Sequence, residues 1–201
     1  MAAAIGLALS TAAPALAVTT LTFEGQFNTI YTAPIQRSGF DVGNVVGEQQ
    51  HFHEIDSNGF GLASNGTGVL LNDRDTQIFL SKVGGGTFSL TSVDVASSLN
   101  NSPGTGITVS GFLANVLTGT ITIANLSQFQ TASGAALGTV DRILFDGTGG
   151  GGGFELDNVV LDGAVSGAVP ESSTWMMMIA GFGIIGSTMR RRVTFAKKAI
   201  A

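Results

Sequence analysis

The only two histidines of the 201-residue chain, His51 and His53, stand two positions apart with Glu54 next to them. In an extended strand, residues i and i+2 project to the same face, so the two imidazoles would lie side by side. Imidazole nitrogens are common ligands of transition-metal ions, but two are too few for a stable site. The pair therefore predicts a transition-metal site if a third ligand arrives from elsewhere. The alternative is an exposed polar face in a loop.

A second group of oxygen-bearing side chains comprises Asn72, Asp73 and Asp75, with Arg74 between the two acids. Calcium prefers such oxygens, but the spacing of an EF-hand loop and its distal glutamate are absent. A solvated turn explains the same residues, and we interpret the segment in that way, with calcium binding as the alternative.

Glu24 and Asp157 lie in the segments that we expect to be the first and last strands of the domain, residues 21–25 and 154–162. The stretches around the two acids are Phe23-Glu24-Gly25 and Phe154-Glu155-Leu156-Asp157-Asn158. These residues are similar to jelly-roll glycan-binding modules, which often hold a structural calcium between the first and last strands. The resemblance implies a calcium ion shared by Glu24 and Asp157. The alternative is that Asp157 and Asn158 form hydrogen bonds to a neighbouring loop.

Motifs that indicate catalysis are missing from the sequence. It has no Gly-x-Ser-x-Gly elbow and no His-Glu-x-x-His, and its glycine run at 149–153 leads into a strand instead of a phosphate-binding helix. Because there is no cysteine, thiol catalysis and cysteine-based zinc sites are excluded. We expect a protein that is not an enzyme. The alternative is a hydrolase that uses Glu54 and Asp56, which requires two carboxyl groups about 5–10 Å apart across a cleft.

Short apolar stretches between Gly, Asn, Ser and Asp clusters make up the body of the chain, and no stretch keeps a 3.6-residue period. The predicted strands are 21–25, 60–63, 69–71, 77–80, 87–96, 107–110, 120–123, 140–145 and 154–161. Segments 60–63 and 69–71 are predicted to pair as a hairpin, and segments 26–61 and 128–138 to be largely irregular. The pattern predicts an all-β antiparallel sandwich over residues 18–162, with the jelly roll as the expected form.

The charge of this body differs from that of the whole chain. Between Val18 and Val169, thirteen acidic side chains face four basic ones, which gives a net charge of −9 against −5 for the full sequence. Such a surface repels nucleic acid and is compatible with cations and neutral glycans. A lectin-like sugar site is disfavoured, because the body has no Trp and a single Tyr, and its alternation places most Phe side chains in the core.

Residues 1–17 have the pattern of a secretory signal peptide. The stretch is apolar and small, and Ala15-Leu16-Ala17 forms a cleavage pattern. A basic n-region is missing, so we expect the true start to lie upstream. The segment predicts export by the Sec machinery.

The other terminus predicts a membrane anchor. Residues 175–189 carry no charge and, as a helix, would span roughly 22 Å, short of the ~30 Å hydrocarbon core. Arg190, Arg191 and Arg192 follow, and the positive-inside tendency keeps them in the cytoplasm with the body outside. We expect a transmembrane helix at 175–189 after a flexible linker at 163–169. The alternative is a buried C-terminal helix of the domain.

This terminus resembles the PEP-CTERM sorting signal of Gram-negative bacteria, in its Trp-containing variant. The residues that carry the resemblance are Val169, Pro170, Glu171, Trp175, the apolar run after it, and Arg190, Arg191 and Arg192. It implies a sorting signal over 170–201, recognition by an exosortase-type membrane enzyme and removal of the tail near Pro170 and Glu171. Ser172 stands where the family has its second proline, which favours slower processing and retention in the inner membrane.

Together these features predict an exported, noncatalytic protein of the cell surface or extracellular matrix. An exosortase-type system would sort it, and the resemblance implies an association with exopolysaccharide and biofilm. One alternative is a calcium-stabilised carbohydrate-binding or adhesion module. The other is the secreted carboxylate-dependent hydrolase.

Overall fold

The computed structural model describes residues 17–24, 28–45, 51–56, 63–74, 76–98, 106–124, 127–149 and 152–164, and the single positions 179 and 182. The chain divides into two units, Leu16–Val165 and the remainder, Met1–Ala15 with Ser166–Ala201. The predicted signal peptide, linker and sorting signal lie almost entirely outside the described residues. Of the predicted helix at 175–189, only Ile179 and Phe182 are described, and both are helical. Within the described residues, no helix has the length and apolar character needed to cross a membrane.

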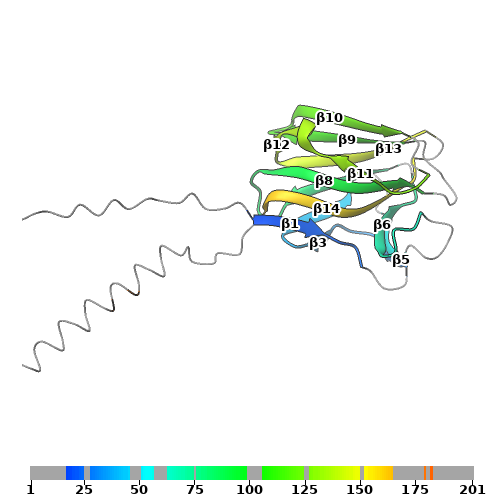
Figure 1. Ribbon diagram of the computed structural model, residues 1–201, viewed down its shortest axis with the longest axis horizontal. Coiled ribbons are helices and arrows are strands. Elements are labelled where there is room, and N and C mark those ends of the chain that lie inside the picture. The colour runs from blue at the N-terminus through cyan, green and yellow to red at the C-terminus, as the bar shows by residue number, and fades with distance from the viewer. Residues whose placement is uncertain are drawn as a thin grey trace, which may run out of the picture. The chain divides into compact units, whose positions relative to one another are not determined.

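Two antiparallel sheets make up the described part of the domain (Figure 1). Sheet A contains β1 (Ala17–Leu21), β2 (Thr29–Tyr31), β5 (Phe52–Asp56), β6 (Gly68–Asn72), β8 (Phe88–Ser97), β11 (Gln130–Ser133), β12 (Thr139–Val140) and β14 (Phe154–Ala164). Sheet B contains β3 (Ile35–Arg37), β4 (Phe40–Asn44), β7 (Gln77–Lys82), β9 (Gly106–Leu113), β10 (Val116–Ala124) and β13 (Arg142–Thr148). One turn of 3-10 helix, η1 (Ala135–Leu137), precedes β12. The predicted all-β antiparallel sandwich is confirmed.

The order of strands brings the two ends of the domain together. Sheet A runs β11-β8-β14-β6-β5-β2, with β1 also paired to β14, and sheet B runs β10-β9-β13-β7-β4-β3. β1 pairs with β14 in antiparallel register, with Leu21 opposite Val159. The first and last strands of the described domain therefore pair, but the first strand is Ala17–Leu21 and shares only Leu21 with the predicted segment 21–25.

A single large core lies between the sheets, because alternate residues of the long strands point inward. In β7 and β13, for example, Ile78, Leu80, Ile143 and Phe145 are buried. The largest side chains of this core are Phe23, Phe40, Phe52, Phe88, Phe145 and Phe154, each no more than 2 % exposed. Complete burial of one such side chain contributes about 1.5–3 kcal/mol, so these rings are a main source of stability in a chain without disulfides. A smaller cluster of Ile55, Val69 and Leu71, with Phe129 packed against it, is separate from this core.

Three details of the predicted strands were wrong. Segment 26–61 contains β2, β3, β4 and β5, although it was expected to be irregular. Segment 128–138 contains β11 and η1. The first strand is Ala17–Leu21 instead of the predicted 21–25, and the two ranges share only Leu21. Of the predicted hairpin strand 60–63, residues 60–62 lie outside the described residues, and β6 pairs with β5 and β14.

Candidate functional site

The outward-facing side chains of sheet B line up in rows because the register of β4, β7, β13 and β9 is regular. One row has Ser81 opposite Arg142 and Arg142 opposite Phe112. The next row has Phe79 opposite Leu144, with Gly43 on the other side of Phe79. Two aromatic rings are thus only half-buried on this face, while the inward-facing phenylalanines are fully buried.

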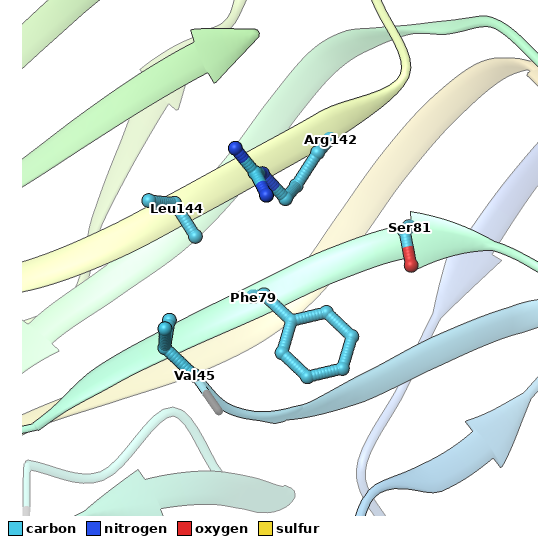
Figure 2. A pocket seen from close by; sticks show the side chains of 5 residues that line it. All are labelled: Val45, Phe79, Ser81, Arg142 and Leu144. Carbon is cyan, nitrogen blue, oxygen red and sulfur yellow. The ribbon is translucent and has the colours of Figure 1, made fainter. Parts of the chain in front are cut away.

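A pocket of about 360 Å³ lies on this face and is lined by Val45, Phe79, Ser81, Arg142 and Leu144. Figure 2 shows these side chains on neighbouring strands, Phe79 and Ser81 on one and Arg142 and Leu144 on the next.

Pro34 lies directly over Gly43, next to Phe79. A Cβ atom at Gly43 would come within 2.9 Å of the Pro34 Cα, so the glycine is what allows this close approach.

Arg142 supplies the charged group of the pocket. Its guanidinium carbon lies 5.0 Å from the centre of the Phe112 ring, and its Nη2 donates to Asn115 Oδ1 at 3.3 Å. Its Nε is buried and has no hydrogen-bond partner among the described residues.

Flat apolar surface and a few hydrogen-bonding groups are thus combined in one hollow. This is the usual composition of a small-molecule or sugar-binding site. The five lining residues include one hydroxyl and one guanidinium, and no carboxylate or imidazole. They therefore offer binding groups without an acid–base pair.

The acids predicted to share calcium, Glu24 and Asp157, both contact the segment that leads into β6. Glu24 Oε2 accepts from the Gly68 amide at 3.1 Å, and Asp157 Oδ2 accepts from the Thr67 hydroxyl at 2.9 Å and from Asn65 Nδ2 at 2.7 Å. Asp157 is completely buried, and its Oδ1 has no hydrogen-bond partner in the described part of the chain. The expected alternative, hydrogen bonds from Asp157 to a neighbouring loop, is observed for Oδ2. The calcium ion stays a prediction.

Glu155, two positions earlier in β14, is a buried acid to which the sequence analysis assigned no role. It is fully buried, its Oε1 accepts from the Ala63 amide at 3.4 Å, and its Oε2 has no partner among the described residues. Burial raises the pKa of Glu155 to about 8, and the Ala63 hydrogen bond opposes this only weakly. The available signal was an acid between two apolar residues, Phe154 and Leu156, at the start of the strand.

The carboxylates of the hydrolase alternative, Glu54 and Asp56, occupy different environments. Glu54 is buried and accepts from Arg37 Nε at 2.9 Å, Arg37 Nη2 at 2.8 Å and the Tyr31 hydroxyl at 3.0 Å. Asp56 is exposed at the end of β5. Since both oxygens of Glu54 are occupied by Arg37 and Tyr31, its contacts are those of a structural ion pair.

The structure brings together two motifs that the sequence analysis treated separately. His51, His53 and Asp73 each offer a ligand atom, and these atoms lie within 4.8 Å of one another. The sorting residues Pro170, Glu171, Ser172, Trp175, Arg190, Arg191 and Arg192 lie outside the described residues, as does Asp75.

No protein-family model matches this chain, and no curated protein matches it either. Among solved structures, it is similar to a mutant of a family 29 carbohydrate-binding module, with 12 % identity over 73 % of this chain and 91 % of that one and a TM-score of 0.41. It is also similar to the K1 cleaved adhesin domain of Lys-gingipain from Porphyromonas gingivalis, with 11 % identity over 72 % and 97 % of the two chains and a TM-score of 0.43. At these identities and TM-scores, the likeness assigns neither a ligand nor a site to this chain.

Proposed function

We propose that this chain is an exported, noncatalytic module that binds a neutral polysaccharide on the outer face of sheet B. The observation that carries the proposal is the pocket in which the half-buried Phe79 ring lies beside Leu144 and the Arg142 guanidinium. A sugar ring has an apolar face that packs on an aromatic ring and hydroxyl groups around its edge that accept hydrogen bonds.

The charge of the domain favours a neutral polymer over an anionic one. With thirteen acids against four basic residues, the body repels acidic polysaccharides as it repels nucleic acid. Among the described residues that line the pocket, Arg142 is the only cation, and its Nη2 already donates to Asn115 Oδ1. One guanidinium therefore serves better as a donor to sugar hydroxyls than as a counter-ion for a polyanion.

The finer form of the fold is part of this proposal. The chain crosses repeatedly between sheets A and B, and its last strand lies in the centre of sheet A between β8 and β6. This order supports a jelly roll. A structural calcium at Glu24 and Asp157 also belongs to the proposal, supported by the unpaired Oδ1 of Asp157.

Replacing Phe79 by Ala tests the binding site. Because the ring supplies the flat apolar face of the pocket, we expect Phe79→Ala to weaken binding of a neutral polysaccharide about tenfold, which corresponds to ~1.4 kcal/mol. Affinity electrophoresis through gels that contain neutral glucans, mannans or xylans measures this directly.

Phe129→Ala is the matched control, because Phe129 is a half-buried ring that packs on the small cluster of Ile55, Val69 and Leu71. We expect the polysaccharide in the gel to retard that variant as much as it retards the wild type. Equal retention of the Phe79 and Phe129 variants, or no retardation of the wild type by any neutral glycan, contradicts the proposed site.

Export and sorting form the second half of the proposed function. The signal-peptide pattern at 1–17 and the Pro170-Glu171, Trp175 and triple-arginine order support delivery across the inner membrane and recognition by an exosortase-type enzyme. The final location is the cell surface or the extracellular matrix, with a transient or retained anchor.

Mass spectrometry of the protein from cells, with and without the sorting enzyme, tests this delivery. We expect a C-terminus near Pro170 in cells that contain the enzyme and an intact tail in cells that lack it. Ser172→Pro restores the Pro-Glu-Pro core and is expected to speed tail loss severalfold. A chain that ends at Ala201 in both kinds of cell overturns the sorting proposal and leaves the glycan site untouched.

A further inference from the structure

A compact group of metal-binding side chains lies at the end of the β5–β6 pair. In β5 and β6, His53 is opposite Leu71, and continuing this antiparallel register by two residues places Asp73 opposite His51. The pairing thus supplies the third ligand that the two histidines lack on their own. Because β5 and β6 are far apart in the sequence, no local sequence pattern indicates that Asp73 lies beside the two histidines.

The ligand atoms face one another closely. Asp73 Oδ1 lies 3.0 Å from His51 Nδ1, and Asp73 Oδ2 lies 3.4 Å from His53 Nε2. In a tetrahedral zinc site with bonds near 2.0–2.1 Å, neighbouring ligand atoms are spaced about 3.3 Å apart. The two imidazole rings are 4.8 Å apart between centres, at 72° to each other. Small rotations of these side chains are therefore sufficient to surround one ion.

His53 provides an independent sign of a missing partner. Its side chain is 8 % exposed, and its Nδ1 lies 2.6 Å from Asn28 Oδ1, which is an acceptor, so Nδ1 carries the proton. In the neutral ring, Nε2 then presents a lone pair to the Asp73 carboxylate. Nε2 is buried and forms no hydrogen bond with the described residues. A cation between Nε2 and the carboxylate removes this repulsion.

The surroundings hold the three side chains in position. The backbone amide of His51 donates to Asn44 Oδ1 at 2.8 Å, and Asn44 Nδ2 donates to Thr76 Oγ1 at 2.8 Å. Asn72, next to Asp73, donates to the Thr76 carbonyl at 2.6 Å and accepts from the Thr76 hydroxyl at 3.0 Å. Asn44 and Asn72 are both fully buried. Such outer contacts are typical of metal sites, where they fix the orientation of the ligands.

We propose that His51 Nδ1, His53 Nε2 and Asp73 bind one divalent transition-metal ion of the zinc class, with water completing the coordination. Two imidazoles and one carboxylate suit zinc better than calcium, which takes six to eight oxygen ligands. The ion ties the start of β5 to the end of β6. This inference does not depend on polysaccharide binding, because its residues lie in or next to β5 and β6 of sheet A and the pocket lies on sheet B.

Zinc titration of the untagged, chelator-treated full chain tests the site. We expect one zinc ion per chain and a rise in melting temperature of about 5–10 °C at one hundred times the dissociation constant. Millimolar calcium is not expected to cause the shifts of the histidine NMR signals that zinc causes. Because the chain has only two histidines, ¹⁵N–¹H NMR reports them without overlap. The expected result is that zinc shifts Nδ1 of His51 and Nε2 of His53.

Three variants separate a built site from surface binding. Asp73→Asn keeps the shape but removes the charge, and we expect it to weaken zinc binding at least tenfold. Asn28→Ala removes the contact to His53 Nδ1, and a 10–100-fold loss is typical of such outer contacts. Asp41→Asn, at a half-buried acid on sheet B, is the control and is expected to bind zinc like the wild type.

The wild-type spectrum keeps the proposal testable even if a variant fails to fold. Histidine signals that stay unchanged with zinc in excess would show that the three side chains form only an ion-pair cluster. Zinc binding that is equally strong in Asp73→Asn and the wild type would locate the ion elsewhere. Either outcome overturns the proposal.

Discussion

Replacing Glu155 by Gln is expected to stabilise the protein at pH 8 by about 2 kcal/mol and to change its stability little at pH 5. Burial raises the pKa of Glu155 to about 8, against 4.5 for an ordinary glutamate. Between these values, the folded state holds a proton that the unfolded state has released. Stability therefore falls as pH rises through this window, by up to ~1.4 kcal/mol per unit. Gln is uncharged throughout, but its amide still lacks a partner, which reduces the gain.

Urea unfolding of Glu155→Gln and wild type at pH 5, 6, 7 and 8 measures this effect. All other titrating groups are the same in both proteins. Their contribution to the pH dependence of the unfolding free energy therefore cancels when the two proteins are compared. We expect the difference in unfolding free energy to grow steadily from pH 5 to pH 8 in favour of the variant. A difference that does not change with pH would show that Glu155 titrates normally in the folded protein.

Breaking the ion pair between Arg37 and Glu54 is expected to destabilise the fold by about 2–3 kcal/mol. Arg37 lies on β3 of sheet B and Glu54 on β5 of sheet A, so the pair joins the two sheets. The Glu54 hydrogen bond is the main reason that the pKa of Arg37 is raised. Loss of one partner of a buried pair typically costs 3–5 kcal/mol. We expect less here because the Arg37 side chain is 35 % exposed, which screens the interaction.

Glu54→Gln tests this contribution by chemical unfolding at constant pH. Asp41→Asn removes the same charge from a half-buried acid whose contact is a surface hydrogen bond from Gln36, and we expect a change within about 0.5 kcal/mol. If the two variants unfold at the same urea concentration, the Arg37–Glu54 pair does not hold the sheets together.

The long strands were predictable because apolar and polar residues alternate along them. Along β8, the inward side chains Phe88, Leu90, Val93 and Val95 include a shift of phase, but the apolar pattern still marks a strand. Strands β2 and β3 have only three residues each, too few for a period to be seen, and they lie at the outer ends of the two sheets. β11 was missed because its residues are small and polar and are mostly exposed.

Both sites depend on pairings between distant segments, which is why the sequence alone did not reveal them. The run Ile78, Phe79, Leu80 is apolar without interruption, so alternation does not show which side chain faces outward. Only the register of β7 with β13 places Phe79 beside Leu144. In the same way, the two histidines were recognised as possible ligands, but the pairing of β5 with β6 was needed to bring Asp73 to them.

The most direct test of the proposed function is NMR shift mapping of the ¹⁵N-labelled protein during titration with oligosaccharides from a neutral polysaccharide that it retains. The proposal predicts that the largest shifts occur at Phe79, Ser81, Arg142 and Leu144 on the outer face of sheet B. Shifts confined to sheet A, or no shifts at saturating oligosaccharide, would contradict binding at this face.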